Sequence, residues 1–322
     1  MNRIIYVVLL LFFTSCSMYE PQEEEVAAVD FELGITLASA SSVVVGDTLY
    51  IAFGRDEDGV YSDKFYKAHI DNIDQLGAFD IPFEARVNGV MQAVGSKIYM
   101  GLGYNDGGVY KPDSYCNDWW QYDCNTGVWS ELAMYEDTET NSAVAWATDT
   151  AIYVTMGYQH YFDSRVFRYS IAQDEWCFVA QGGEVTNRMI ATGATAQGRF
   201  FAGGGFNAKM VDDWCEFDIE TNKWYYRTSP STSARLFASA IGLGNYIYML
   251  GGRYWGGTLT TQYFYENIIR YDVSGDSWSS LGKMPQGSCE NMIIFTYENA
   301  LYWGLGEQED GSFVTKVYKL EL

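Results

Sequence analysis

Apolar segments that end in a glycine recur six times along the chain, at steps of about fifty residues. Each segment carries an aromatic residue four positions before its glycine; the pairs are Tyr50 and Gly54, Tyr99 and Gly103, Tyr153 and Gly157, Phe201 and Gly205, Tyr248 and Gly252, and Tyr302 and Gly306. Such a segment is typical of a buried β-strand that leads into a turn. A repeat of this length cannot bury an apolar face alone, so its copies must stack on one another, radially or as a solenoid.

A second pattern follows four of these glycines: an aromatic residue and, seven positions later, a tryptophan. Asp123, Asp218 and Asp272 come directly after three of these aromatics, and their side chains can cap a tight turn. We therefore expect the aromatic and the tryptophan on paired neighbouring strands, buried at the interface to the next repeat. The pairs are Tyr122 and Trp129, Tyr169 and Trp176, Phe217 and Trp224, and Tyr271 and Trp278.

The glycine-ended strand, the variable loop, the aromatic with its turn and the tryptophan together resemble the kelch repeat, most clearly from Ala238 to Trp278. The resemblance implies an all-β protein, a six-bladed kelch β-propeller with four-stranded antiparallel blades over residues 28–322. The composition agrees, because 17% of the residues are aromatic and 32 are glycine. The first repeat is degenerate around Phe65 to Gln75, where the tryptophan is missing.

The last repeat ends with Val317 to Leu322, which matches the third strand of a blade, so its fourth strand is missing. Near the start, Asp30 to Gly34 aligns with Asp276 to Gly282, and Phe31 takes the place of Trp278. We therefore predict that the N-terminal strand completes blade six and closes the ring, which would remove exposed sheet edges.

The segment before the repeats is different in character. Residues 1–15 combine an early Arg3 with an apolar run from Ile4 to Phe13, too short to cross a bilayer and typical of a signal peptide. Small residues before Cys16 resemble a bacterial lipobox, which implies lipidation of Cys16. Residues 16–27 are acidic and are expected to form a disordered tether, similar to the surface-export signal of Bacteroidetes lipoproteins. We expect an outer-membrane lipoprotein, exposed on the cell surface or, alternatively, facing the periplasm.

The chain has 42 acidic and 20 basic residues, a formal net charge of −22. An acidic surface repels phosphate backbones, so we expect no nucleic-acid partner. We also expect no metal and no other cofactor. His69 and His160 lie in different repeats and are too few for the copper site of kelch oxidases, and the acidic loops at residues 56–59 and 307–311 lack the ligand spacing of an EF-hand. The protein is expected to be monomeric.

One repeated position, thirteen residues before each repeat aromatic, leads into the first strand of a blade, on the same face as the loop between strands two and three. We call it the approach position; its occupants are Leu37, Arg86, Thr140, Arg188, Arg235 and Cys289. The three arginines are candidate ligand-binding residues, because a guanidinium can hold a carboxylate through two hydrogen bonds. The alternative is that each arginine braces its neighbouring blade by pairing with an acid.

Loops on this face are rich in aromatic residues. Rings add contact area with little loss of rotamer freedom, as in sugar-binding or peptide-binding surfaces. Folding back over the blade edges is the alternative. The candidate ligand-binding residues in these loops are Tyr104, Tyr110, Tyr161, Arg253, Tyr254 and Trp255.

Three functions remain open. We expect an exported, lipid-anchored propeller that binds a glycan or a protein on its loop face, with no assigned catalytic residue. The alternative resembles the sialic-acid epimerases among kelch proteins and would act as an epimerase or mutarotase on an acidic sugar by acid–base chemistry, with Glu184, Glu266 and Glu290 as candidate acids. A structural subunit of an outer-membrane assembly is the third. A glutamate and an arginine that converge in a closed pocket would favour the enzyme.

Overall fold

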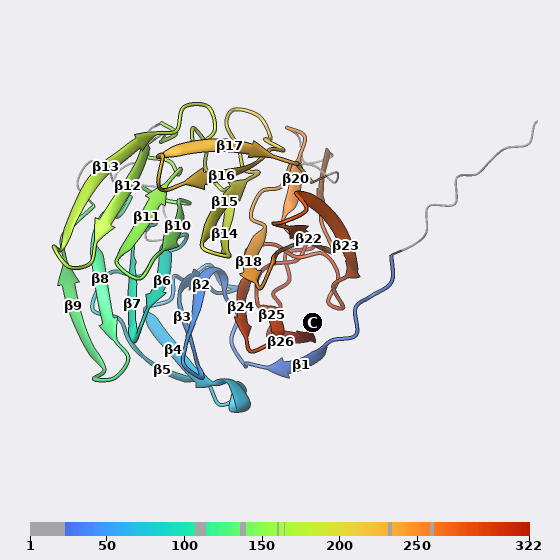
Figure 1. Ribbon diagram of the computed structural model, residues 1–322. Coiled ribbons are helices and arrows are strands. Elements are labelled where there is room, and N and C mark those ends of the chain that lie inside the picture. Colours follow the sequence, from blue (N-terminus) through green and yellow to red (C-terminus); the bar gives the residue numbers. More distant parts are fainter. Residues whose placement is uncertain are drawn as a thin grey trace, which may run out of the picture.

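The computed structural model describes residues 23–106, 114–135, 140–159, 161–163, 165–230, 234–257 and 261–322. Six four-stranded antiparallel sheets surround a central axis, and each sheet is one blade (Figure 1). The all-β six-bladed propeller predicted from the repeats is thereby confirmed. Among the described residues, 3-10 conformation occurs at Ile70–Asn72 and at Thr261, and no helix is long and apolar enough to cross a membrane.

Each blade is an up-and-down meander whose first strand lies nearest the axis (Figure 1). Blade one contains β2 (Ala38–Val45), β3 (Thr48–Arg55), β4 (Lys64–His69) and β5 (Gly77–Asp80). Blade two contains β6 (Val90–Val94), β7 (Lys97–Gly101), β8 (Trp119–Asp123) and β9 (Val128–Leu132). Blade three contains β10 (Val144–Ala147), β11 (Ala151–Thr155), β12 (Arg165–Ser170) and β13 (Glu175–Gln181).

The remaining blades follow the same plan. Blade four contains β14 (Thr192–Ala196), β15 (Arg199–Gly203), β16 (Trp214–Asp218) and β17 (Lys223–Arg227). Blade five contains β18 (Ser239–Leu243), β19 (Tyr246–Leu250), β22 (Asn267–Asp272) and β23 (Ser277–Lys283), and a small hairpin of β20 (Arg253–Trp255) and β21 (Gln262–Phe264) projects from it. Blade six contains β24 (Ile293–Tyr297), β25 (Ala300–Gly304), β26 (Lys316–Glu321) and β1 (Val29–Glu32).

The ring closes as predicted. Strand β1 pairs antiparallel with β26, and Phe31 lies opposite Val317. Blade six is thus built from segments at opposite ends of the sequence, which lie side by side at the lower right of the disc in Figure 1.

The repeat glycines lie where one blade meets the next. Each amide donates a hydrogen bond to the carbonyl of the approach residue of the following blade, from Gly54 to Arg86 (2.9 Å) round to Gly306 to Leu37 (2.7 Å). Gly306 has a φ of +90°, and a Cβ there would lie 2.4 Å from the carbonyl oxygen of Glu290. Because no side chain fits, the sequence repeats a glycine at this position.

The apolar core is divided into six clusters, one between each pair of neighbouring blades. A blade has neighbours on both sides, so strands such as β11 are buried along their whole length. Trp176 packs on Trp119 and Trp278 on Trp214, with ring centroids 5.3 and 5.4 Å apart. The predicted place of these tryptophans at a blade interface is confirmed, but their partner is the preceding blade and not the next one.

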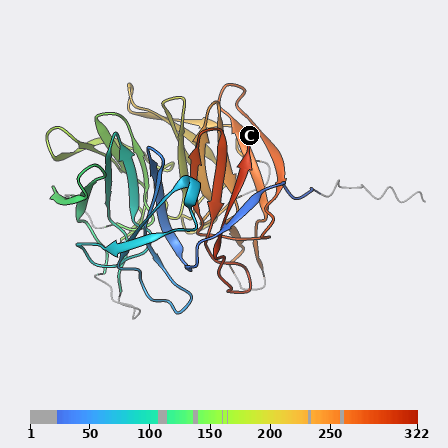
Figure 2. The same cartoon turned by 90° about the horizontal axis from the view of Figure 1, so that it is seen from below.

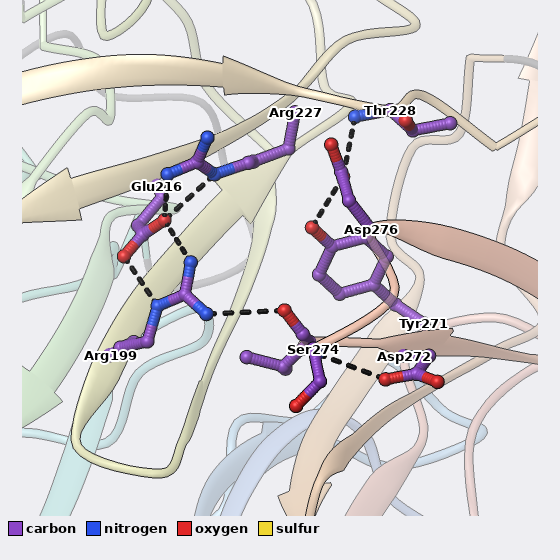
Figure 3. A network of polar contacts seen from close by, with 9 residues as sticks. Arg199, Glu216, Arg227, Thr228, Tyr271, Asp272, Ser274 and Asp276 are labelled. Carbon is purple, nitrogen blue, oxygen red and sulfur yellow. Dashed lines mark hydrogen bonds and ion pairs between the residues drawn. The ribbon is translucent and has the colours of Figure 1, made fainter.

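A polar clamp accompanies the tryptophan of blade five (Figure 3). Asp276 accepts hydrogen bonds from the Tyr271 hydroxyl (2.7 Å) and from the backbone amide of Thr228 in blade four (2.9 Å). The indole of Trp278 donates to the carbonyl of the same Thr228 at 2.7 Å. Asp174 has the equivalent role in blade three. Neighbouring blades are therefore joined by directed hydrogen bonds as well as by apolar burial.

Glu216 in β16 lies between two arginines of its own blade, as Figure 3 shows. Its carboxylate accepts from Arg199 Nε at 2.6 Å and from Arg227 Nε at 2.8 Å. Burial alone would raise the pKa of Glu216, but the hydrogen bonds from both arginines outweigh it and hold the pKa below its usual value. Arg199 also donates to the carbonyl of Val273 in blade five at 3.1 Å, so this group links two blades.

The chain contacts blade five before it enters β1. The amide of Val26 donates to the carbonyl of Lys283 (2.9 Å), and the amide of Lys283 donates to the carbonyl of Glu24 (2.8 Å). Backbone contacts with the propeller thus begin a few residues ahead of the domain boundary predicted at residue 28.

Candidate functional site

A channel runs along the propeller axis and is lined by the first strands of the blades. It contains two cavities, of about 460 and 200 Å³. Both are lined by small residues that include Ala40, Gly89 and Ala143. Figure 2 shows the disc from the side, with the strands running between its two faces.

Six backbone positions, one from the entry to each blade, surround the smaller cavity, and we call them the backbone ring. All six have a positive φ, between 56° and 61°, and line the smaller cavity. Amides donate to the carbonyl of the preceding member, for example Asn88 to Ser39 at 3.2 Å and Asn291 to Phe237 at 3.1 Å. The ring consists of Ser39, Asn88, Ser142, Ile190, Phe237 and Asn291.

Beside the backbone ring lies the channel mouth, formed by the residue directly after each repeat glycine. Each such residue pairs through its backbone with a residue on the returning loop, and the returning residue is aromatic in five blades and methionine in the other. The pairs are Arg55 with Tyr61, Tyr104 with Tyr115, Tyr158 with Phe162, Phe206 with Met210, Arg253 with Phe264, and Glu307 with Phe313. The mouth is therefore charged at blades one, five and six and aromatic at blades two, three and four.

The charged half consists of Arg55, Arg253, Glu290 and Glu307. Arg55 forms an ion pair with Glu307, and Arg253 Nε lies 3.3 Å from Glu290 Oε2. Glu290 and Glu307 are joined by two backbone hydrogen bonds of 3.0 Å. The two arginine side chains retain 32% and 31% of their exposure, so solvent and ligands reach them.

Glu290 is the most unusual group of the mouth. It is only 3% exposed, and although Asn291 donates to its Oε1 at 3.2 Å, its Oε2 has no hydrogen-bond partner among the described residues. Burial raises its pKa, Arg253 and Arg55 oppose the rise, Glu307 adds to it, and the pKa reaches about 7. A buried carboxyl with such a pKa can donate or accept a proton near neutral pH.

The aromatic half is a continuous chain of ring contacts, which we call the aromatic arc. Successive ring centroids are 5.1 to 6.4 Å apart. In contrast to the rings of the inter-blade core, those of the arc are partly exposed. The arc runs from blade two to blade five through Tyr104, Tyr115, Tyr158, Phe162, Phe206 and Trp255.

The three arginines at approach positions lie deeper in the protein. They are 2 to 3% exposed, and each donates to a backbone carbonyl sixteen residues further along the chain. Arg86 and Arg188 also form two-pronged ion pairs with an aspartate, and Arg235 donates to an asparagine at 2.8 Å. This geometry favours the bracing interpretation, and ligand binding by these arginines stays a prediction. The side-chain partners are Asp118, Asp213 and Asn267.

Of the loop candidates, Tyr104 and Trp255 belong to the aromatic arc, and Arg253 belongs to the charged half. Tyr254 stacks on Tyr263 within the β20–β21 hairpin, with centroids 5.2 Å apart. Tyr161 is 53% exposed in the blade-three loop. The predictions for Tyr110, His160 and Cys16 fall outside the described residues.

Among the candidate acids, only Glu290 converges with an arginine at the mouth. Glu184 is exposed, and Glu266 pairs with Lys283 at 2.7 Å. Sequence reasoning missed Arg55 and Glu307, although their position directly after a repeat glycine was a usable signal. Across the described part of the chain, no three metal-binding side chains cluster.

The chain is similar to known propeller proteins. The sequence model of the family described as "Attractin/LZTR1 beta-propeller" matches residues 80–302. Kelch-like protein 25 of Xenopus tropicalis is 26% identical over 181 residues, which are 56% of this chain and 29% of that protein. N-acetylneuraminate epimerase 1 of Escherichia coli O6:H1 is 25% identical over 240 residues, 71% of this chain and 55% of that protein.

The chain therefore spans less than two thirds of the length of each of these relatives. A solved structure described as "Structure of YjhT" superposes with a TM-score of 0.75 and 16% sequence identity. The match covers 90% of this chain and 96% of that one, so the two share a fold.

Proposed function

The chain belongs to the Attractin/LZTR1 beta-propeller family, and we propose that its propeller binds an acidic sugar at the channel mouth and interconverts the anomers of that sugar. The observation that carries the proposal is Glu290. A buried carboxyl whose Oε2 forms an ion pair at 3.3 Å but no hydrogen bond with a described residue, and whose pKa is near neutrality, is costly to keep in a fold, and such groups cluster at functional sites.

The ligand carboxylate would bind to the arginines of the charged half. Arg55 and Arg253 are both partly exposed and both already face carboxylates, so their guanidinium groups are oriented for this chemistry. A ligand carboxylate that engages Arg253 would draw it from Glu290 and open access to that acid. The sugar ring would then lie beside the aromatic arc.

Interconversion of anomers needs one acid and one base. In its protonated form Glu290 would donate a proton to the ring oxygen, while a base, for which Glu307 is placed, takes the proton of the anomeric hydroxyl. The ring C–O bond breaks to give an open-chain carbonyl, and closure on the other face reverses both transfers. No atom is gained or lost and no redox partner is needed.

The relatives bear on two candidate functions, interconversion of sugar anomers and binding without catalysis. The printed name of the Escherichia coli relative is an epimerase of an acidic sugar, and that relative aligns with 71% of this chain. Kelch-like protein 25 aligns with 56%. Binding without catalysis, to a glycan or to a protein, is the second candidate, and the exposed rings of the loop face favour it because aromatic side chains anchor both kinds of ligand.

The test is the rate of anomer exchange of N-acetylneuraminate, followed by proton NMR. We expect the protein to accelerate exchange and Glu290→Gln to abolish the acceleration. Glu220→Gln, in an exposed turn on the opposite face, is the matched control and should leave the rate unchanged. Saturable binding without exchange would turn the proposal into glycan recognition, and absence of both would leave a protein partner as the ligand.

We also propose that the protein is an outer-membrane lipoprotein attached through Cys16. This rests on the sequence of residues 1–27 alone. Incorporation of labelled fatty acid into the wild type but not into Cys16→Ala would support it, and equal labelling of both would overturn it. Protease accessibility on intact cells would then distinguish the cell surface from the periplasm.

A further inference from the structure

The aromatic arc is longer than one sugar ring requires. Its six rings pass from blade two to blade five, whereas the charged half is confined to blades one, five and six. Near the charged half, Trp255 contacts Phe206 with centroids 5.7 Å apart, and three further contacts link Phe206 back to Tyr115.

Packing alone does not explain the arc. Rings that serve only the inter-blade core, such as those of Trp119 and Tyr271, are completely buried. The arc members are partly exposed, and Trp255 keeps 36% of its accessible surface. Aromatic side chains that remain open to solvent on loops of one face are a surface for a ligand.

Charge at the mouth is separated from this surface. Among the described residues at mouth positions, every charged side chain lies in blade one, five or six. Asp106, an acid close to the arc, accepts a hydrogen bond from Tyr61 at 2.9 Å. A ligand that fits this arrangement carries its negative charge at one end and presents uncharged faces along the rest of its length.

We propose that the substrate is a short oligosaccharide whose reducing-end residue is the acidic sugar. This rests on the proposed function, because anomer interconversion requires a free anomeric carbon at Glu290. The remaining residues must then be linked through another hydroxyl and extend from the charged half across the mouth, where they stack on Trp255, Phe206 and Phe162. Different sugars can stack on an aromatic face, so the arc would discriminate between oligosaccharides by their length more than by the identity of their sugars.

The experiment compares N-acetylneuraminate with a dimer in which a neutral hexose is linked to O8 of N-acetylneuraminate, so that the only carboxylate lies on the residue with the free reducing end. Affinity is measured by titration calorimetry and anomer exchange by NMR, both with the full-length protein. We expect the dimer to bind about tenfold more tightly, since one well-formed aromatic contact is worth roughly that factor. Phe162→Ala should remove most of this advantage and leave the monosaccharide unaffected, because Phe162 is separated from Trp255 by the ring of Phe206. Trp255→Ala should weaken binding of both sugars, because Trp255 is the arc residue near the charged half.

Tyr225→Ala is the control, because Tyr225 is an exposed ring (41%) on the outer strand β17, away from the mouth. Thermal unfolding of each variant excludes loss of fold. Exchange of the monosaccharide without a preference for the dimer would overturn this inference and leave the proposed function intact. Tighter binding of the dimer without exchange of either sugar would support an extended binding surface on the arc, but it would overturn both the assignment of the dimer as a substrate and the catalytic part of the proposed function. Absence of binding by both sugars would overturn both.

Discussion

Arg253 Nε lies 3.3 Å from Glu290 Oε2, and within the part of the chain that the structure describes neither atom takes part in a hydrogen bond. The two residues come from different blades, β20 of blade five and the approach to blade six. An ion pair that is close but not hydrogen-bonded leaves both groups ready for another partner. This relationship makes the mouth a candidate for acid–base chemistry.

The first prediction concerns pH and stability. Burial, first of all, raises the pKa of Glu290 from 4.5 to about 7. Between these values the folded state binds more protons than the unfolded state, so Glu290 stabilises the fold below about pH 4.5, and this contribution is lost as the pH rises to about 7. The total is on the order of 3 kcal/mol. Urea unfolding at pH 5 and pH 8 measures it.

Glu290→Gln should flatten this pH dependence and make the variant more stable than the wild type at pH 8. The rate of anomer exchange should depend on protonated Glu290 and should therefore fall above about pH 7, where the acid form of Glu290 disappears. An unchanged pH profile of stability in Glu290→Gln would assign the effect to other groups.

The second prediction separates the two kinds of tryptophan. Trp278→Ala should destabilise the protein by about 3 kcal/mol, because it removes the contact with Trp214 and the hydrogen bond to Thr228. Trp255→Ala should cost about 0.5 kcal/mol, because its ring lies on a loop and is partly exposed, yet it should weaken binding of the sugar dimer. Denaturant titration and calorimetry measure the two effects. A large loss of stability in Trp255→Ala would remove it from the binding surface.

The third prediction concerns the bracing arginines. Arg188→Ala should destabilise the fold by about 3 kcal/mol, because it leaves the partly buried Asp213 without its ion pair. Affinity for the sugar should stay the same. Arg270→Ala, an arginine on the surface of blade five, is the control, with an expected change within about 0.5 kcal/mol. Lost binding with unchanged stability in Arg188→Ala would instead make Arg188 a ligand contact.

The fourth prediction concerns the repeat glycine. Gly306→Ala should destabilise by more than about 3 kcal/mol, because a Cβ would meet the carbonyl of Glu290 at 2.4 Å and because φ is positive. Gly46→Ala also has a positive φ, but no atom lies within 4 Å of the place that its new methyl group would take, so its cost should be about 1 to 2 kcal/mol. Denaturant titration of both variants measures the difference. Equal costs for both would mean that the close approach at Gly306 does not matter.

Much of the fold could be predicted because its causes are local and repeated. The glycine seen at Gly306 is repeated along the chain because the junction between two blades leaves no room for a side chain. The tryptophan seen at Trp278 is repeated because its ring packs the blade against its neighbour. The prediction that these tryptophans pack on the next blade was wrong, because strand spacing indicates that two blades meet but not which of the two neighbours receives the ring. The arginines at approach positions were grouped correctly, but their burial depends on distant acids such as Asp213.

The sequence by itself determined the strand repeat, the number of blades and the closing strand, because each follows from a short pattern that recurs along the chain. Only the tertiary structure decided which side chains meet at the mouth. Arg55 and Glu307 are 252 residues apart and pair because the ring closes between blades six and one. Burial raises the pKa of Glu290 and Glu307 adds to the rise, while Arg253 and Arg55 oppose it. These groups lie on three different blades, so no local sequence pattern predicts the result.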